Sequence, residues 1–112
     1  MYNFNGREYP CCSSLTMGII GGKWKTAILY NLMNETLRYN ELRKKMSTVV
    51  TDRTLSLQLK SLAEDGIIKR KVFYSKPPLK VEYSLTDFGK TLIPLIQLIA
   101  DWGAFVNERN TK

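Results

Sequence analysis

The chain has 112 residues, which fits one domain with a modest core, and its 44% apolar and 24% charged residues are typical of a globular protein. No run of 18 apolar residues can span a membrane, and the N-terminus lacks an apolar segment of signal-peptide length, so we expect a cytoplasmic protein with reduced thiols. The absence of histidine, with only two adjacent cysteines, argues against a zinc site, a cofactor and an enzyme.

The first third of the chain predicts an arm and two helices. Residues 1–10 are polar and end at a proline, which predicts a flexible arm. Ser13 or Ser14 is a suitable N-cap for a short first helix, and the Gly21–Gly22 pair ends that helix. A second helix is predicted over residues 23–32, because its apolar positions recur at spacings of three and four.

The best-defined element is a fourth helix, which follows a two-residue strand and a third helix over about residues 40–46. Thr51 is a good N-cap residue, Asp52 suits the positive end of the helix dipole, and Gly66 supplies the stop. Leucines at spacings of four and three predict the buried face: Leu55, Leu59 and Leu62. The residues off this stripe face outward: Arg53, Ser56, Leu57 and Lys60.

A hairpin and a long helix complete the chain. Two β-rich runs, residues 67–74 and 79–85, are separated by two prolines, which cannot donate to a sheet and so give a stiff tip. Thr86 caps the last helix, and Pro94 should bend or interrupt it. This helix carries a wider apolar face than one small domain can easily cover: Leu92, Leu95, Ile96, Ile99, Trp102, Phe105 and Val106.

All of the surplus positive charge falls between Arg38 and Lys80. This segment holds 11 basic and 4 acidic side chains, so it carries +7, the net charge of the whole chain. Charge gathered on a compact helical unit is typical of a surface that meets a polyanion. A solvated basic face is the alternative, and charge alone does not exclude it.

The order of elements favours the nucleic-acid interpretation. Three helices followed by a two-stranded hairpin is the winged helix-turn-helix layout, so the expected fold is mainly α with a small β-hairpin. The fourth helix is then predicted to enter the major groove and present the recognition residues Thr51, Arg53, Ser56, Leu57 and Lys60. Wing and phosphate contacts to double-stranded DNA are predicted for Lys76, Lys80, Arg43, Lys44 and Lys23.

Several sequence motifs resemble the HxlR family of bacterial winged-helix transcription factors. They run in order along residues 11–103 and include Ile20–Lys25, Leu37–Leu42, Leu59–Gly66, Val81–Thr86 and Ala100–Gly103. The resemblance implies a MarR/HxlR-like fold, a homodimer joined by its terminal helices, and transcriptional control at a pseudo-palindromic operator.

This resemblance divides the single domain into working parts. Dimerisation helices are expected over residues 11–33 and 86–110, and the DNA-binding core and wing over residues 38–85. The implied dimer interface agrees with the excess of apolar surface on the last helix. Its expected residues are Leu15, Ile19, Leu95, Ile99, Trp102 and Phe105.

The adjacent thiols suggest regulation by an effector. Cys11 falls where many members of the family carry a cysteine, which in some of them senses electrophiles, quinones or oxidants. Cys12 replaces the family's usual following proline, and no distant cysteine is present. Sensing would use a Cys11–Cys11′ bond between subunits, a mixed disulfide, alkylation, or a Cys11–Cys12 bond. A buried and inert thiol is the alternative.

Two further hypotheses use the same residues. Winged helices also serve as docking modules, so an acidic protein partner is an alternative to DNA on the basic surface. A small-molecule pocket near Trp102 and Phe105 is another alternative to a dimer core. An enzyme is disfavoured, because the chain has no phosphate-binding glycine loop and no evident nucleophile–base pair.

Overall fold

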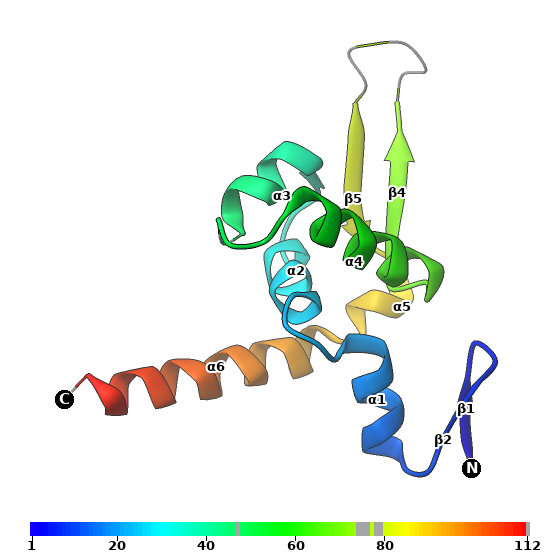
Figure 1. Ribbon diagram of the computed structural model, residues 1–112, viewed down its shortest axis with the longest axis vertical. Coiled ribbons are helices and arrows are strands. Elements are labelled where there is room, and N and C mark those ends of the chain that lie inside the picture. Colours follow the sequence, from blue (N-terminus) through cyan, green and yellow to red (C-terminus); the bar gives the residue numbers. More distant parts are fainter. Residues whose placement is uncertain (47, 74–76, 78–79, 112) are drawn as a thin grey trace.

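The computed structural model describes residues 1–46, 48–73, 77 and 80–111 (Figure 1). Over this part of the chain the elements follow in the order β1 (Tyr2–Phe4), β2 (Arg7–Tyr9), α1 (Cys12–Ile20), α2 (Lys25–Leu32), β3 (Leu37–Arg38), α3 (Tyr39–Lys45), α4 (Asp52–Glu64), β4 (Ile68–Val72), β5 (Val81–Leu85), α5 (Asp87–Lys90) and α6 (Ile93–Asn110). The predicted mainly α fold with a small β-hairpin is confirmed. Lys76, a predicted wing contact, lies outside the described residues.

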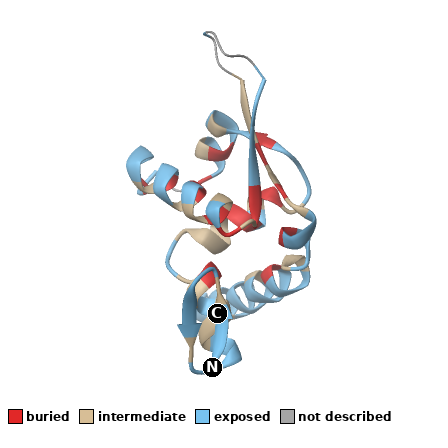
Figure 2. Ribbon diagram, turned by 90° about the vertical axis from the view of Figure 1, so that its right-hand side faces the viewer, coloured by how far each residue is buried: buried red, intermediate tan, exposed pale blue. Residues whose placement is uncertain are grey.

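The core lies where α2 and α4 pack against the base of a small sheet, and Figure 2 shows that burial is concentrated there. The predicted leucine stripe of α4 is confirmed, since Leu55, Leu59 and Leu62 are all buried. Aliphatic side chains from the other elements complete the core, among them Ile20, Ile28, Leu29, Leu42, Val50, Ile67 and Ile68. Burying such side chains contributes about 1.5–3 kcal/mol each, which fixes α4 on the body of the protein.

The sheet is antiparallel, with the strand order β3-β5-β4. Arg70 pairs with Tyr83, whereas Lys69 pairs with Ser84 and Lys71 with Glu82. Because neighbouring residues of a strand point to opposite faces, Arg70 lies on one face of the sheet and the two lysines on the other.

The predicted flexible arm is wrong. Residues 2–9 form an antiparallel β-hairpin, in which Tyr2 pairs with Tyr9. Asn5 and Gly6 form its turn with φ angles of 48° and 77°, and an Asn-Gly pair is a strong signal for a two-residue hairpin turn. The ordinary turn chemistry of these two residues was missed because the segment is short and polar.

The ends of two helices also differ from the prediction. Helix α1 has Cys11, not Ser13 or Ser14, as its N-cap, which places both serines in the first turn beside the thiol. The last helix is interrupted as expected, and two helices result. Thr86 caps the short α5, its hydroxyl oxygen accepting a hydrogen bond from the Gly89 amide at 2.9 Å. Pro94 lies in the first turn of α6, where its missing N–H costs nothing.

The molecule is more extended than its length requires. Its radius of gyration is 15.4 Å, whereas a compact domain of this length has about 13 Å. Figure 1 shows why: α6 extends sideways from the lower part of the body, and the β4–β5 hairpin extends upward from its top. Both projections expose side chains that a partner can contact.

Candidate nucleic-acid interface

Helices α3 and α4 form a helix-turn-helix that packs on α2, and Asp52 in the first turn of α4 bonds to α3 at the surface. Its Oδ1 accepts hydrogen bonds from the Tyr39 hydroxyl and from Nε of Arg43, both at 2.9 Å. These two bonds, Tyr39 first, lower the pKa of Asp52, while burial raises the pKa of Tyr39. The Thr51 hydroxyl oxygen caps the helix by accepting from the Thr54 amide at 3.1 Å, as predicted. The start of α4 is therefore capped and bonded to α3.

The predicted recognition residues of α4 form one outward surface, which we call the recognition face. Thr51, Arg53, Ser56, Leu57 and Lys60 are all exposed, opposite the buried leucines. Leu57 is 52% exposed, although it is a large apolar residue in the middle of a helix. This surface offers a guanidinium, an ammonium, hydroxyl groups and an apolar contact, which are the groups that bind base edges and phosphates.

A cleft between α4 and the wing extends this face. It has a volume of about 590 Å³ and is lined by Ser56, Lys60 and Glu64 of α4 and by Arg70 and Tyr83 of the sheet, among others. Arg70 was not among the predicted contacts. The sequence shows that Lys69, Arg70 and Lys71 alternate along a strand, and the structure shows that only the middle residue shares a face with Tyr83.

Two lysines and an aromatic ring lie together near the end of the wing. The ammonium groups of Lys71 and Lys80 lie 4.8 Å and 4.7 Å from the centre of the Phe73 ring. Such cation–π contacts hold both charges at the exposed end of the hairpin. Of the predicted wing lysines, the structure therefore describes Lys80, and it adds Lys71 and Phe73.

The other predicted phosphate contacts divide into two groups. Lys44 is exposed on α3, and Arg43 beside it is partly buried by its bond to Asp52. Lys23 lies in the connection between α1 and α2, which Figure 1 shows at the end of α2 that is farther from the wing. Its ammonium is 5.1 Å from the Trp24 ring. The structure does not bring Lys23 together with the recognition face.

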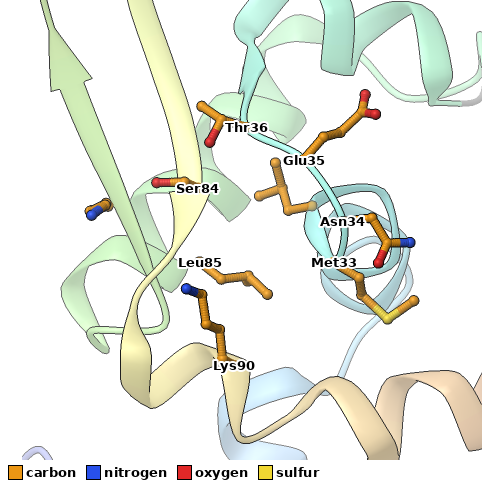
Figure 3. Close-up of a pocket in the computed structure, with 9 residues that line it drawn as sticks. Met33, Asn34, Glu35, Thr36, Ser84, Leu85 and Lys90 are labelled. Atoms are coloured by element: carbon orange, nitrogen blue, oxygen red, sulfur yellow. The ribbon is translucent and has the colours of Figure 1, made fainter.

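A second cleft lies away from α4 (Figure 3). It has a volume of about 360 Å³ and is lined by the connection from α2 to β3, by β5 and by α5. Ser84 and Lys90, labelled in Figure 3, line it together with Lys69. This cleft is separate from the recognition face, because it lies with Lys69 on the other side of the sheet.

Cys11 has an environment that activates a thiol. Both cysteines are free and exposed. The Sγ of Cys11 lies 3.4 Å from the Ser13 hydroxyl and 3.1 Å from the Ser14 hydroxyl. Hydrogen bonds from these hydroxyl groups, Ser13 first, lower the pKa of Cys11 to about 7 from an ordinary 9.0. Cys11 is exposed, so the alternative of a buried thiol is wrong. Exposure and a lowered pKa are the conditions under which a cysteine can react.

Helix α6 presents the apolar surface that the sequence predicted. Leu95, Ile99, Trp102 and Phe105 are exposed, Trp102 at 69%. Leu98, at 65%, belongs to the same stripe and was not predicted. Ile19 differs from the prediction, because it is buried in the core of its own chain at 8% exposure, and Leu15 is partly buried against that core. The terminal contacts available to a partner are therefore mainly those of α6.

Comparison with known proteins identifies the family. The model of the HxlR-like helix-turn-helix family matches residues 19–111. The chain belongs to this family. A relative in Bacillus subtilis (strain 168), the uncharacterized HTH-type transcriptional regulator YdeP, is 48% identical over 102 residues, which cover 91% of this chain and 78% of that protein. The putative regulatory protein MalR of Fusobacterium mortiferum is 42% identical over 97 residues, 86% of this chain and 90% of MalR.

Solved structures agree with this assignment. The redox regulator HypR in its reduced form is 39% identical, covers 90% of this chain and 98% of its own, and has a TM-score of 0.82. HypR in its oxidized form is 44% identical, covers 84% and 95%, and has a TM-score of 0.77. This HxlR-type chain is thus a DNA-binding transcriptional regulator with the predicted winged helix-turn-helix fold. Within the described residues, no helix is both long and apolar enough to cross a membrane.

Proposed function

We propose that this HxlR-type regulator binds a pseudo-palindromic operator as a homodimer, with α4 in the major groove. The observation that carries the proposal is the recognition face: five exposed side chains of suitable chemistry on a helix whose other side is fixed in the core. Arg53 and Ser56 contact base edges, and Lys60 and Arg70 contact phosphates on either side of the cleft. Lys71 and Lys80 hold the wing on the flanking backbone.

The second subunit covers the apolar stripe of α6. Its members are spaced by three and four residues, so they form one continuous face: Leu95, Leu98, Ile99, Trp102 and Phe105. Burying such a stripe against its own copy resembles the packing of a domain core and favours an obligate dimer. Two recognition helices then enter successive major grooves about one helical turn, or 34–36 Å, apart.

The effector of this regulator is a thiol-reactive compound that meets Cys11. The exposed Sγ, its two serine neighbours and its lowered pKa support this assignment. The similarity to the redox regulator HypR adds to the support. Electrophiles would alkylate the thiolate of Cys11. Oxidants would join it in a disulfide, either to Cys12 of the same subunit or to Cys11 of the second subunit.

The experiment compares three variants by fluorescence anisotropy on an operator duplex. Arg53→Ala should weaken operator binding about tenfold or more and relax the preference for one base pair, because a base contact is lost. Lys60→Ala should weaken specific and random duplexes alike and reduce the slope of log affinity against log salt by about two, because the dimer loses one phosphate contact in each subunit.

Lys23→Ala is the matched control, because it removes an exposed cation that lies away from the recognition face. It should bind like the wild type. Equal losses in all three variants would contradict the proposal, since the surface would then act only through its total charge. Competition by an acidic protein but not by DNA would favour the docking module.

A further inference from the structure

Asp65 is the one buried charged side chain among the described residues, at 8% exposure. It follows directly after Glu64 as the C-cap of α4. This position is unfavourable for an anion, because the C-terminal end of a helix is already negative and burial removes water from the carboxylate. A carboxylate here needs a partner that supplies positive charge.

The N-terminal hairpin supplies that partner. Nη2 of Arg7 lies 2.9 Å from Oδ1 and 3.0 Å from Oδ2 of Asp65. Nδ2 of Asn5 donates to the same Oδ1 at 3.0 Å and to the Glu64 carbonyl at 3.4 Å. The turn of the hairpin is therefore attached to the C-terminal end of α4 by three hydrogen bonds to one carboxylate and one to the backbone.

Two aromatic contacts attach the hairpin to its other neighbours. The Phe4 ring lies 6.1 Å from the Phe88 ring of α5, between centroids. Tyr9 lies so close to α1 that a Cβ on Gly18 would collide with its ring. The hairpin thus bridges α1, α5 and the end of α4, three elements far apart in the sequence. It also lies outside residues 19–111, the range that the family model matches.

We propose that this hairpin, which we call the clamp (residues 2–9), positions the recognition helix relative to α1 and so sets the half-site spacing that the dimer accepts. The proposal rests on the proposed function, because spacing has meaning only for a dimer that reads two half-sites. Arg7 and Asp65 are positioning residues: they hold the end of α4 opposite to the end that meets DNA.

The length of α4 gives the clamp leverage. Its 13 residues span about 20 Å, so a tilt of about 10° about the clamped end moves the other end by about 3 Å. The buried leucines limit the tilt, and the clamp adds a fixed point beyond the last of them, Leu62. Cys11 lies two residues after the end of the clamp. A covalent modification of its thiol therefore acts on α4 through the clamp and its Arg7–Asp65 ion pair.

The test measures operator affinity against half-site spacing. The duplexes carry the two half-sites of the operator at the separation that the wild type prefers, and at separations one and two base pairs longer or shorter. Two base pairs move a half-site by about 7 Å and rotate it by about 70°. The wild type should prefer the original spacing by about tenfold or more, which corresponds to a defined distance between two helices.

Three variants loosen the clamp in two different ways. Asp65→Asn and Arg7→Gln remove one charge each, and Gly18→Ala displaces Tyr9 without touching the ion pair while adding a better helix former to α1. Glu35→Gln is the matched control, because it removes an exposed ion pair, 3.9 Å from Lys45, elsewhere on the surface. Circular dichroism confirms that each variant is folded at the assay temperature.

The clamp variants should prefer the original spacing by about fivefold or less, against about tenfold or more for the wild type. Glu35→Gln should keep the wild-type preference. Uniform weakening at every spacing, with the preference unchanged, would overturn the proposal, because a merely structural role lowers all affinities together. Failure of the wild type itself to prefer any operator over random duplex would remove the proposed function, and the clamp with it. The two failures are therefore distinguishable.

Discussion

The pKa of Cys11 gives a prediction that depends on two hydroxyl groups. In the Cys12→Ser protein, which has a single thiol, the alkylation rate should rise with pH around a midpoint of about 7. Replacing both serines, Ser13→Ala and Ser14→Ala, removes the hydroxyl groups that stabilise the thiolate. The midpoint should then move upward, because the charged form loses its hydrogen bonds while the neutral thiol loses little.

The size of the effect follows from the shift. At pH 7 a thiol with the lowered pKa is about half ionised, against about 1% at an ordinary 9.0, which is a gain of about fiftyfold in thiolate. Nucleophilicity falls with basicity at a coefficient of about 0.4–0.5, which removes about six- to tenfold over two pKa units. At pH 7, Cys11 should therefore react about five- to eightfold faster than an ordinary thiol. Above about pH 9, where both thiols are largely ionised, Cys11 should react more slowly than the ordinary thiol.

The assay is the rate of iodoacetamide modification between pH 5.5 and 10, followed by intact mass. The same protein in urea supplies the ordinary thiol, because unfolding removes the serine contacts. The folded and unfolded profiles should cross. A folded midpoint near 9.0, or a midpoint that ignores the serine substitutions, would refute the assignment of Cys11 as an activated thiol.

Three further predictions concern packing and assembly. Gly89→Ala should destabilise the fold by about 1–3 kcal/mol, seen as a lower Tm, because its Cβ would meet the backbone carbonyl of Ile67, which cannot rotate away; an unchanged Tm would contradict this contact. Thr86→Val should lower the free energy of unfolding in urea by about 1–2 kcal/mol, because the hydroxyl both caps α5 and donates to the Gly66 carbonyl at 2.6 Å. A decrease no larger than that caused by Thr→Val at an exposed position would argue against the cap. Trp102→Ser should raise the dimer dissociation constant about tenfold or more in sedimentation experiments, and an unaltered sedimentation profile would place the interface elsewhere.

The sequence allowed α4 and the wing to be predicted well, because their signals are local. Thr51 before a leucine stripe and Gly66 after it define the helix, and both work as expected, Gly66 with a φ of 75°. The recognition face then follows from helical periodicity alone. The alternation of charges on β4 was visible too, but choosing Arg70 required knowing which face of the sheet turns toward α4.

The missed features depend on contacts between distant segments. Nothing near Asp65 indicates that Arg7 neutralises it, since the two residues lie 58 positions apart. Ile19 belongs to an apolar pattern that fits either a dimer face or the core, and only packing decides between them. The serines beside Cys11 lower its pKa only because their hydroxyl groups point at Sγ, and that orientation depends on the residue at which α1 begins.

Selection from a random duplex library, followed by anisotropy titration, tests most directly whether a dimer binds specific DNA sequences through α4. We predict enrichment of a two-fold symmetric sequence with half-sites about one helical turn apart, bound at about nanomolar concentration in the presence of random competitor. The affinity should fall with Arg53→Ala. A library without any enriched sequence, or an enriched sequence that Arg53→Ala binds as tightly as the wild type, would contradict the account.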